Sequence, residues 1–176
     1  MGLEKRWISA FVIITVVAVT GLFWQHQPPT TNFNEANTIN FADVAWLLTA
    51  SCLVLLMTPG LSFFYGGMVG KKNVISTMLK SFICLGVVSL LWVTVGFSLS
   101  FGSPIGINLN GTYYGIIGNP LDFAFFDQVE LLPHKALGSS IPFILFALFH
   151  LYFAVITPAI ITGALAERIR FISFLL

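Results

Sequence analysis

The chain has 176 residues, of which 57% are hydrophobic and only 9% are charged, whereas soluble domains carry roughly 25% charged residues. So few ionic groups cannot cover the surface of a soluble fold of this length, and a net charge of +1 gives no bulk attraction to nucleic acid. With its long uncharged runs, the composition predicts an all-α integral membrane protein, a polytopic helical bundle, without a nucleic-acid partner.

The first apolar segment, residues 7–24, follows a short charged stretch and contains no charged residue. Two interpretations stay open for residues 1–24, because a positively charged start before an apolar run is typical of a cleaved signal peptide and also of a signal-anchor helix. Residues 25–42 are polar and contain Pro28-Pro29, which blocks helix continuation. They are expected to form an extracytoplasmic segment.

Three further apolar segments run over residues 44–69, 74–101 and 141–164. Each exceeds the roughly 20 residues that a helix needs to cross the hydrocarbon core. Residues 171–176 have the character of another segment that stops after six residues, so a truncated chain is expected. Residues 43–176 are accordingly predicted to form the N-terminal part of a larger membrane domain, with three full helices and the start of a fourth.

Basic residues predict how these segments are oriented. Alternating ends place seven of the eight Lys and Arg residues on one side, which by the positive-inside rule is the cytoplasm. Segment 44–69 then runs inward, and the connection 102–138, rich in the Gly and Asn residues of turns, is extracytoplasmic. Lys80, near the start of its span, is expected to snorkel to the cytoplasmic side. The seven residues are Lys5, Arg6, Lys71, Lys72, Lys80, Arg168 and Arg170.

Side chains that could carry out chemistry are scarce within the predicted spans, where Lys80 and His150 are the ionisable residues well inside helical limits. An intramembrane protease or redox enzyme would need carboxylates, ligands or a nucleophile at depth. The chain is therefore predicted not to be an enzyme, and no spacing indicates a metal site or a cofactor. Cys52 and Cys84 lie in apolar runs, which favours buried thiols over a disulfide.

Two local patterns allow alternative interpretations. Gly66 and Gly70 form a small-xxx-small pair, for which ordinary helix packing is the favoured explanation. Phe149 and Phe153 stand four residues apart and thus on one helix face. Two such rings can close a pore or face lipid, and the residues alone favour lipid. The charged run 164–170 is in itself explained by a membrane boundary.

Three blocks of sequence nevertheless resemble one family, the Amt/Mep/Rh ammonium transporters. Order, spacing and topology agree over residues 42–176. The blocks are LMTPG at 56–60 with FYGG at 64–67 and KNV at 72–74, WVTVGFSLSFG at 92–102, and GALAERIRF at 163–171.

The resemblance implies a fragment of an eleven-helix fold built from two inverted halves, assembled as a homotrimer in the cell (inner) membrane. It implies transport of ammonium or ammonia through an apolar pore that stacked phenylalanines gate. Phe153 falls on the family's gate position and Phe149 on its companion nearer the outer vestibule. His150 stands where many members carry glutamine. A contact with the vestibule is open for it, and burial at a subunit interface or among lipid headgroups is favoured.

Two further expectations follow from the same resemblance. A PII-type regulatory protein is a potential partner on the cytoplasmic side. The alternative function is an ammonium sensor, in which the same fold binds the cation and passes a signal to a C-terminal module.

Overall fold

The computed structural model describes residues 12, 16, 39–109, 112–169 and 173–174. The predicted signal peptide or anchor and nearly all of the extracytoplasmic segment 25–42 lie outside the described residues. Those described fall into two compact units. We call residues 39–92 and 129–169 with 173–174 the helical unit, and residues 93–109 and 112–128 the hairpin unit.

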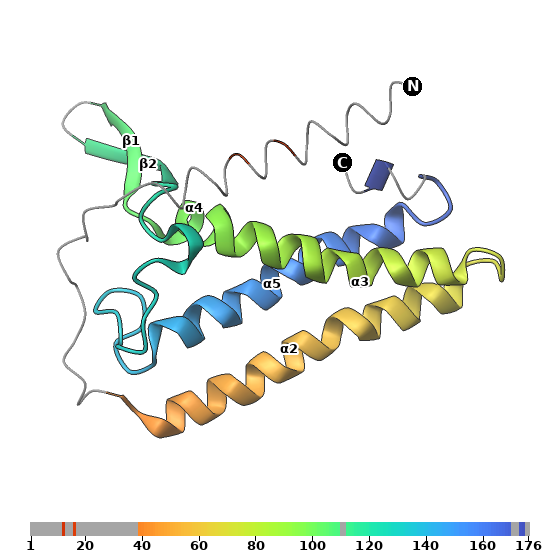
Figure 1. Ribbon diagram of the computed structural model, residues 1–176, viewed down its shortest axis with the longest axis horizontal. Coiled ribbons are helices and arrows are strands. Elements are labelled where there is room, and N and C mark those ends of the chain that lie inside the picture. The colour runs from red at the N-terminus through yellow and green to blue at the C-terminus, as the bar shows by residue number, and fades with distance from the viewer. Residues whose placement is uncertain (1–11, 13–15, 17–38, 110–111, 170–172, 175–176) are drawn as a thin grey trace. The chain divides into compact units, whose positions relative to one another are not determined.

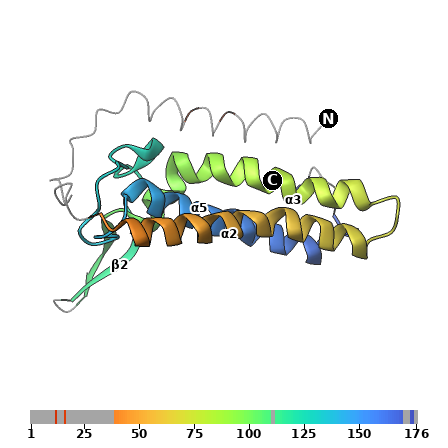
Figure 2. The same ribbon diagram turned by 90° about the horizontal axis from the view of Figure 1, so that it is seen from below.

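Three long helices build the helical unit, and each packs against the other two (Figures 1 and 2). They are α2 (Phe41–Met68), α3 (Val74–Leu91) and α5 (Phe143–Ala164). α3 continues through a π-helical turn, Trp92–Gly96, into α4 (Phe97–Phe101), so that the apolar span covers Val74–Phe101. The predicted membrane-spanning segments are confirmed as helices of membrane length, with ends shifted by at most three residues.

Polar side chains of small size lie at the contacts between the three helices. The hydroxyl of Ser62 on α2 donates to the carbonyl oxygen of Met78 on α3 over 3.1 Å. The hydroxyls of Ser81 on α3 and Thr162 on α5 lie 3.3 Å apart, and both side chains are fully buried. Small residues of this kind let helix backbones approach closely, and hydrogen bonds between helices replace the hydration that a bilayer cannot supply.

Glycines permit two of these helix contacts. A Cβ added at Gly66 would lie 2.8 Å from Cγ of Met78, and one added at Gly163 would lie 2.4 Å from Cε1 of Tyr65. The packing role predicted for Gly66 is thus confirmed. Gly70 does not take part in this helix packing as the small-xxx-small pattern had suggested. It lies beyond the end of α2 at Met68, and its N–H donates to Glu167.

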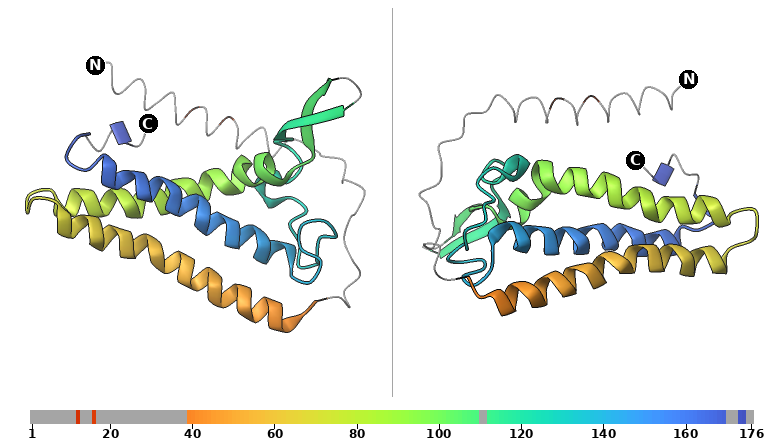
Figure 3. Two further views of the ribbon diagram at one scale, coloured as in Figure 1. Left: turned by 180° about the vertical axis from the view of Figure 1, so that it is seen from behind. Right: turned by 60° about the horizontal axis from the view of Figure 1, so that its bottom comes forward.

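The hairpin unit contains two antiparallel strands, β1 (Pro104–Leu109) and β2 (Thr112–Gly118), in which Leu109 is paired with Thr112 (Figure 3). The register shifts by one residue between Ile105 and Gly106. A β-hairpin was not among the sequence expectations, which placed only turns in the connection 102–138.

Asp122 joins the two residues that flank this hairpin, Ser103 before β1 and Asn119 after β2. Its carboxylate accepts hydrogen bonds from the backbone N–H of Ser103 at 2.6 Å, from the Ser103 hydroxyl, and from the Asn119 side-chain amide at 2.6 Å. Phe97 is fully buried beside them, with its ring 5.5 Å from that of Phe123. Since an isolated two-stranded hairpin is marginally stable in water, these contacts are what stabilises it.

Candidate functional site

The two phenylalanines singled out in the sequence contact each other on α5. Their ring centroids lie 5.1 Å apart at an interplanar angle of 74°, the edge-to-face arrangement that aromatic pairs prefer. Phe149 is partly buried, and Phe153 is 44% exposed. The expected common face is confirmed, and one ring of the pair is accessible from outside the helical unit.

This pair ends a longer row of rings. The ring of His150 lies 5.6 Å from that of Phe149 and 4.2 Å from that of Phe146. Phe146 in turn stacks on Phe143 at 6.1 Å, and Phe143 stacks on His134, which precedes α5, at 4.8 Å. We call these six residues the aromatic row: His134, Phe143, Phe146, His150, Phe149 and Phe153.

His150 joins this row from the helix face of Phe146, which lies four residues before it. Its Nδ1 lies 2.9 Å from the carbonyl oxygen of Phe146. A carbonyl can only accept, so Nδ1 carries the hydrogen in this contact. The imidazole is therefore held by the backbone of its own helix, with its ring against two phenylalanines.

His134 has the opposite hydrogen-bonding role. Its Nδ1 accepts from the backbone N–H groups of Ala136 at 3.3 Å and Leu137 at 3.2 Å, so the neutral ring carries its hydrogen on Nε2. Burial lowers the pKa of His134 below its ordinary value, because desolvation disfavours the charged imidazolium. The ring thus closes the turn that leads into α5, and it does so in its neutral form.

The aromatic row can interact with a ligand through the faces of its rings, which attract cations. A cation placed over an aromatic face gains roughly 0.5–2 kcal/mol, the larger values applying where water is excluded. Among the residues that the structure describes, no group of three or more His, Cys, Asp and Glu side chains is arranged to hold a metal ion. The ring faces of the row can therefore attract a small cation.

Charged groups gather at the other end of the helical unit, where α2 turns into α3 and where α5 ends. Oε1 of Glu167 accepts from the N–H of Gly70 at 2.9 Å and from the side-chain amide of Asn73 at 3.1 Å. The hydrogen bond from Asn73 and then that from Gly70 lower the pKa of Glu167. The charged run after α5 is thus a tie between helices as well as a membrane boundary.

Lys80 and the cysteines differ in part from expectation. Lys80 is directed toward this charged end, but it is only 3% exposed, and its ammonium donates to the carbonyl oxygen of Ile169 at 3.0 Å. It is therefore held inside the protein instead of snorkelling into water. Both Cys52 and Cys84 are free thiols, as predicted, but burial is confirmed for Cys84 alone, since Cys52 lies exposed on α2.

Comparison with known proteins gives a consistent result. Residues 45–176 match the model of the Ammonium Transporter Family. The chain is 42% identical over 139 residues to a Mycobacterium tuberculosis protein named "Ammonium transporter", covering 76% of this chain and 29% of the relative. It is 41% identical over 138 residues to a Bacillus subtilis protein of the same name, covering 78% of this chain and 31% of the relative.

A solved structure agrees with these sequence relatives. The crystal structure of Saccharomyces cerevisiae Mep2 is similar with a TM-score of 0.62 and 32% sequence identity, over 79% of this chain and 30% of that chain. The chain thus spans about 30% of the length of the relatives that it matches. With three helices of membrane length among its described residues, it is a multi-pass membrane protein. This chain belongs to the ammonium transporter family.

Proposed function

We propose that the protein conducts ammonium or ammonia across the cell (inner) membrane and that Phe149 and Phe153 gate its pore. The observation that carries this proposal is the edge-to-face contact of the two rings at 5.1 Å, with Phe153 accessible on one side. The names of the relatives, which are transporters and not enzymes, support the substrate and the type of activity.

The arrangement suits a small cation that must lose water before it enters an apolar path. Ring faces of the aromatic row offset part of the dehydration cost through cation–π attraction. The ring of Phe153 closes the path until the cation displaces it, and in the family's mechanism neutral ammonia then crosses the apolar stretch. Phe149 and Phe153 would act only through contact with the permeating species. Conversion of the cation to ammonia breaks one N–H bond, and its proton must pass to another group or to water, because neither phenylalanine can accept it.

Flux measurements on the full-length protein in proteoliposomes test this role. Phe153→Ala is expected to raise leakage and to weaken selection of methylammonium over potassium, with a loss of up to roughly thirtyfold in affinity if one cation–π partner is worth about 2 kcal/mol. Phe153→Leu keeps apolar bulk and removes the ring face, so it should preserve closure and lose only affinity.

Ile161→Ala provides a matched control, because Ile161 is also large, apolar and 51% exposed on α5. Its flux and selectivity should equal those of the unmodified protein. Unchanged flux and selectivity for Phe153→Ala at equal protein level would assign Phe153 to the lipid face. Saturable ammonium binding without any flux in the unmodified protein would favour the sensor function.

The assembly follows from the family resemblance and is proposed on that basis. We propose a homotrimer, with a PII-type regulatory protein as a partner on the cytoplasmic side. Residues 1–24 are proposed to be a signal peptide or signal anchor, and residues 43–176 the N-terminal part of the transporter domain.

A further inference from the structure

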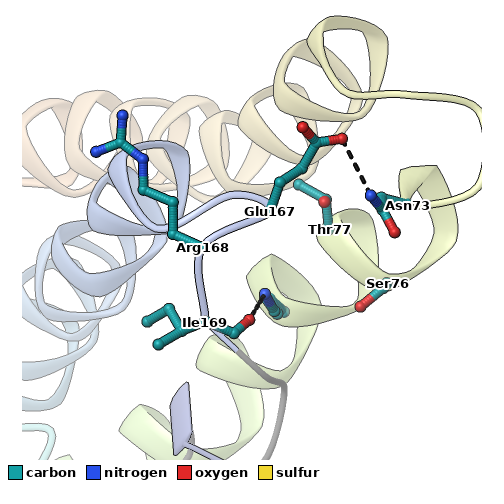
Figure 4. A pocket seen from close by; sticks show the side chains of 7 residues that line it. Asn73, Ser76, Thr77, Glu167, Arg168 and Ile169 are labelled. Carbon is teal, nitrogen blue, oxygen red and sulfur yellow. Dashed lines mark hydrogen bonds between the residues drawn. The ribbon is translucent and has the colours of Figure 1, made fainter.

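A polar cavity of about 280 Å³ lies at the charged end of the helical unit (Figure 4). One wall is the beginning of α3, with Asn73, Thr77 and Lys80, and the other is the segment after α5, with Glu167 and Arg168. Ligand pockets measure roughly 300–1,000 Å³. A volume near the lower limit fits a compact polar group and not a large organic ligand.

Lys80 is the buried charge in the wall of this cavity. Its side chain is 3% exposed, and within the described part of the chain its ammonium has one acceptor, the carbonyl oxygen of Ile169 at 3.0 Å. A lysine ammonium has three N–H donors. Buried cationic groups require acceptors or a counter-charge, because desolvation without them is costly. The remaining donors thus call for acceptors within the cavity.

The surrounding charge favours an anion as their source. Four basic residues lie at this end of the described chain, and Glu167 is the one acidic residue there, which gives a net charge of +3. Oε1 of Glu167 already accepts two hydrogen bonds, from Gly70 and Asn73. The basic residues are Lys71, Lys72, Lys80 and Arg168.

The orientation given by the basic residues places this end at the cytoplasmic surface, where anionic lipids give the membrane a negative potential. We propose that the cavity binds a phosphate group, with the ammonium of Lys80 as its buried partner and Arg168 as its exposed one. An anionic lipid headgroup and free phosphate present the same chemistry. A phosphate oxygen supplies the acceptors that the buried ammonium lacks among the described residues.

Native mass spectrometry of the detergent-solubilised full-length protein tests the proposal, with phosphatidylglycerol and phosphatidylcholine as probes. Phosphatidylglycerol should bind more tightly, and Lys80→Gln should weaken it roughly fivefold or more, since one basic residue near an anionic surface is worth about 1 kcal/mol. Gln removes the charge and keeps amide N–H donors, on a side chain one atom shorter than that of Lys. Lys80→Arg should keep tight binding, and so should Lys135→Gln, which removes an exposed basic residue at the opposite end.

A parallel arm identifies the source of the phosphate, using thermal unfolding with inorganic phosphate. Protection that depends on Lys80 but is given by inorganic phosphate and not by phosphatidylglycerol would support the site and assign it to a soluble ligand. If Lys80→Gln fails to fold, Arg168→Gln replaces it and should weaken binding several-fold. Equal binding of both lipids together with no protection by phosphate, or binding indifferent to both substitutions, would overturn the proposal.

Discussion

The two ends of the helical unit are held in different ways. At the charged end, hydrogen bonds join residues 89 to 97 positions apart, such as Lys80 with Ile169 and Gly70 with Glu167. At the aromatic end, most ring contacts join residues three or four positions apart within α5, such as Phe149 with Phe153. The aromatic end also has hydrogen bonds between distant residues, from the N–H of Asn40 to the carbonyl oxygen of Ser140 at 2.9 Å and from Nε1 of Trp92 to that of Ala147 at 3.3 Å. Both ends therefore join different helices, and only the ring contacts of the aromatic row are mostly local.

Gly163→Ala should lower the stability of the helical unit the most. Gly163 lies toward the charged end, and its backbone packs closely against the ring of Tyr65. The added Cβ would lie 2.4 Å from Cε1 of that ring. Overpacking of this kind costs typically 1–3 kcal/mol, so the thermal unfolding temperature in detergent should fall. Adding Tyr65→Ala should restore part of the loss.

Gly60→Ala is the matched control, since Gly60 is also helical and nothing lies within 4 Å of a Cβ added there. It should be neutral or stabilise by up to about 1 kcal/mol, through helix propensity alone. Equal unfolding temperatures for the two variants would mean that α2 and α5 do not meet through Tyr65 and Gly163.

Glu167→Gln should have a smaller effect, confined to the turn between α2 and α3. The amide oxygen can still accept a hydrogen bond, but the charge that strengthens the contacts with Asn73 and Gly70 is lost. Hydrogen exchange at the Gly70 amide should become faster at neutral pH. In the unmodified protein the same loss should appear only in acid, because the lowered pKa of Glu167 keeps the carboxylate charged until the pH falls below its ordinary range. If the substitution left hydrogen exchange at the Gly70 amide unchanged, the proposed role of Glu167 in holding this turn would be contradicted.

The smallest effect is expected at the aromatic end, from the protonation of His134. Burial lowers its pKa, so the folded protein binds fewer protons than the unfolded chain. The stability that the neutral ring contributes is present above about pH 6.5 and is lost as the pH falls through the lowered folded value. The amides of Ala136 and Leu137 should then exchange faster in acid, after correction for intrinsic rates. In His134→Ala their exchange should be fast at every pH, and a pH response retained there would refute this role.

Sequence alone predicted the spans well, because a helix in lipid must be apolar over its whole length whatever it packs against. The shared face of Phe149 and Phe153 was equally accessible, since helical spacing is a local property. The partners of Glu167 and Lys80 were not, because residues more than 80 positions apart are brought together by tertiary packing. Phe143, Phe146 and His150 also stand three and four residues apart on the same helix, but this spacing was not used. His134 could not be found in this way, because it precedes the helix and no periodicity connects it with Phe143.

The β-hairpin was missed for a different reason. Asn110-Gly111 between two β-rich runs is a strong signal for a hairpin with a two-residue turn. Its Gly and Asn residues were interpreted only as turn formers in a long connection. The strands themselves are short, six and seven residues, and their alternation is interrupted at the register shift beside Gly106. The Gly and Asn content of the connection correctly indicated turns. It could not show that the two strands pair, because that depends on which residues of one strand lie opposite those of the other.

The hydrogen bond from Lys80 to Ile169 also bears on how the protein is made. Its acceptor is encoded 89 residues after its donor, and ribosomes add about 5–20 residues per second. The nascent lysine therefore waits roughly 4–18 seconds, at that rate, before its carbonyl partner is synthesised. During this interval the third apolar segment, residues 74–101, lies in the translocon or the lipid with an unmatched ammonium near its N-terminal end. Burial of that group therefore comes after the synthesis of its own helix, in the order set by translation.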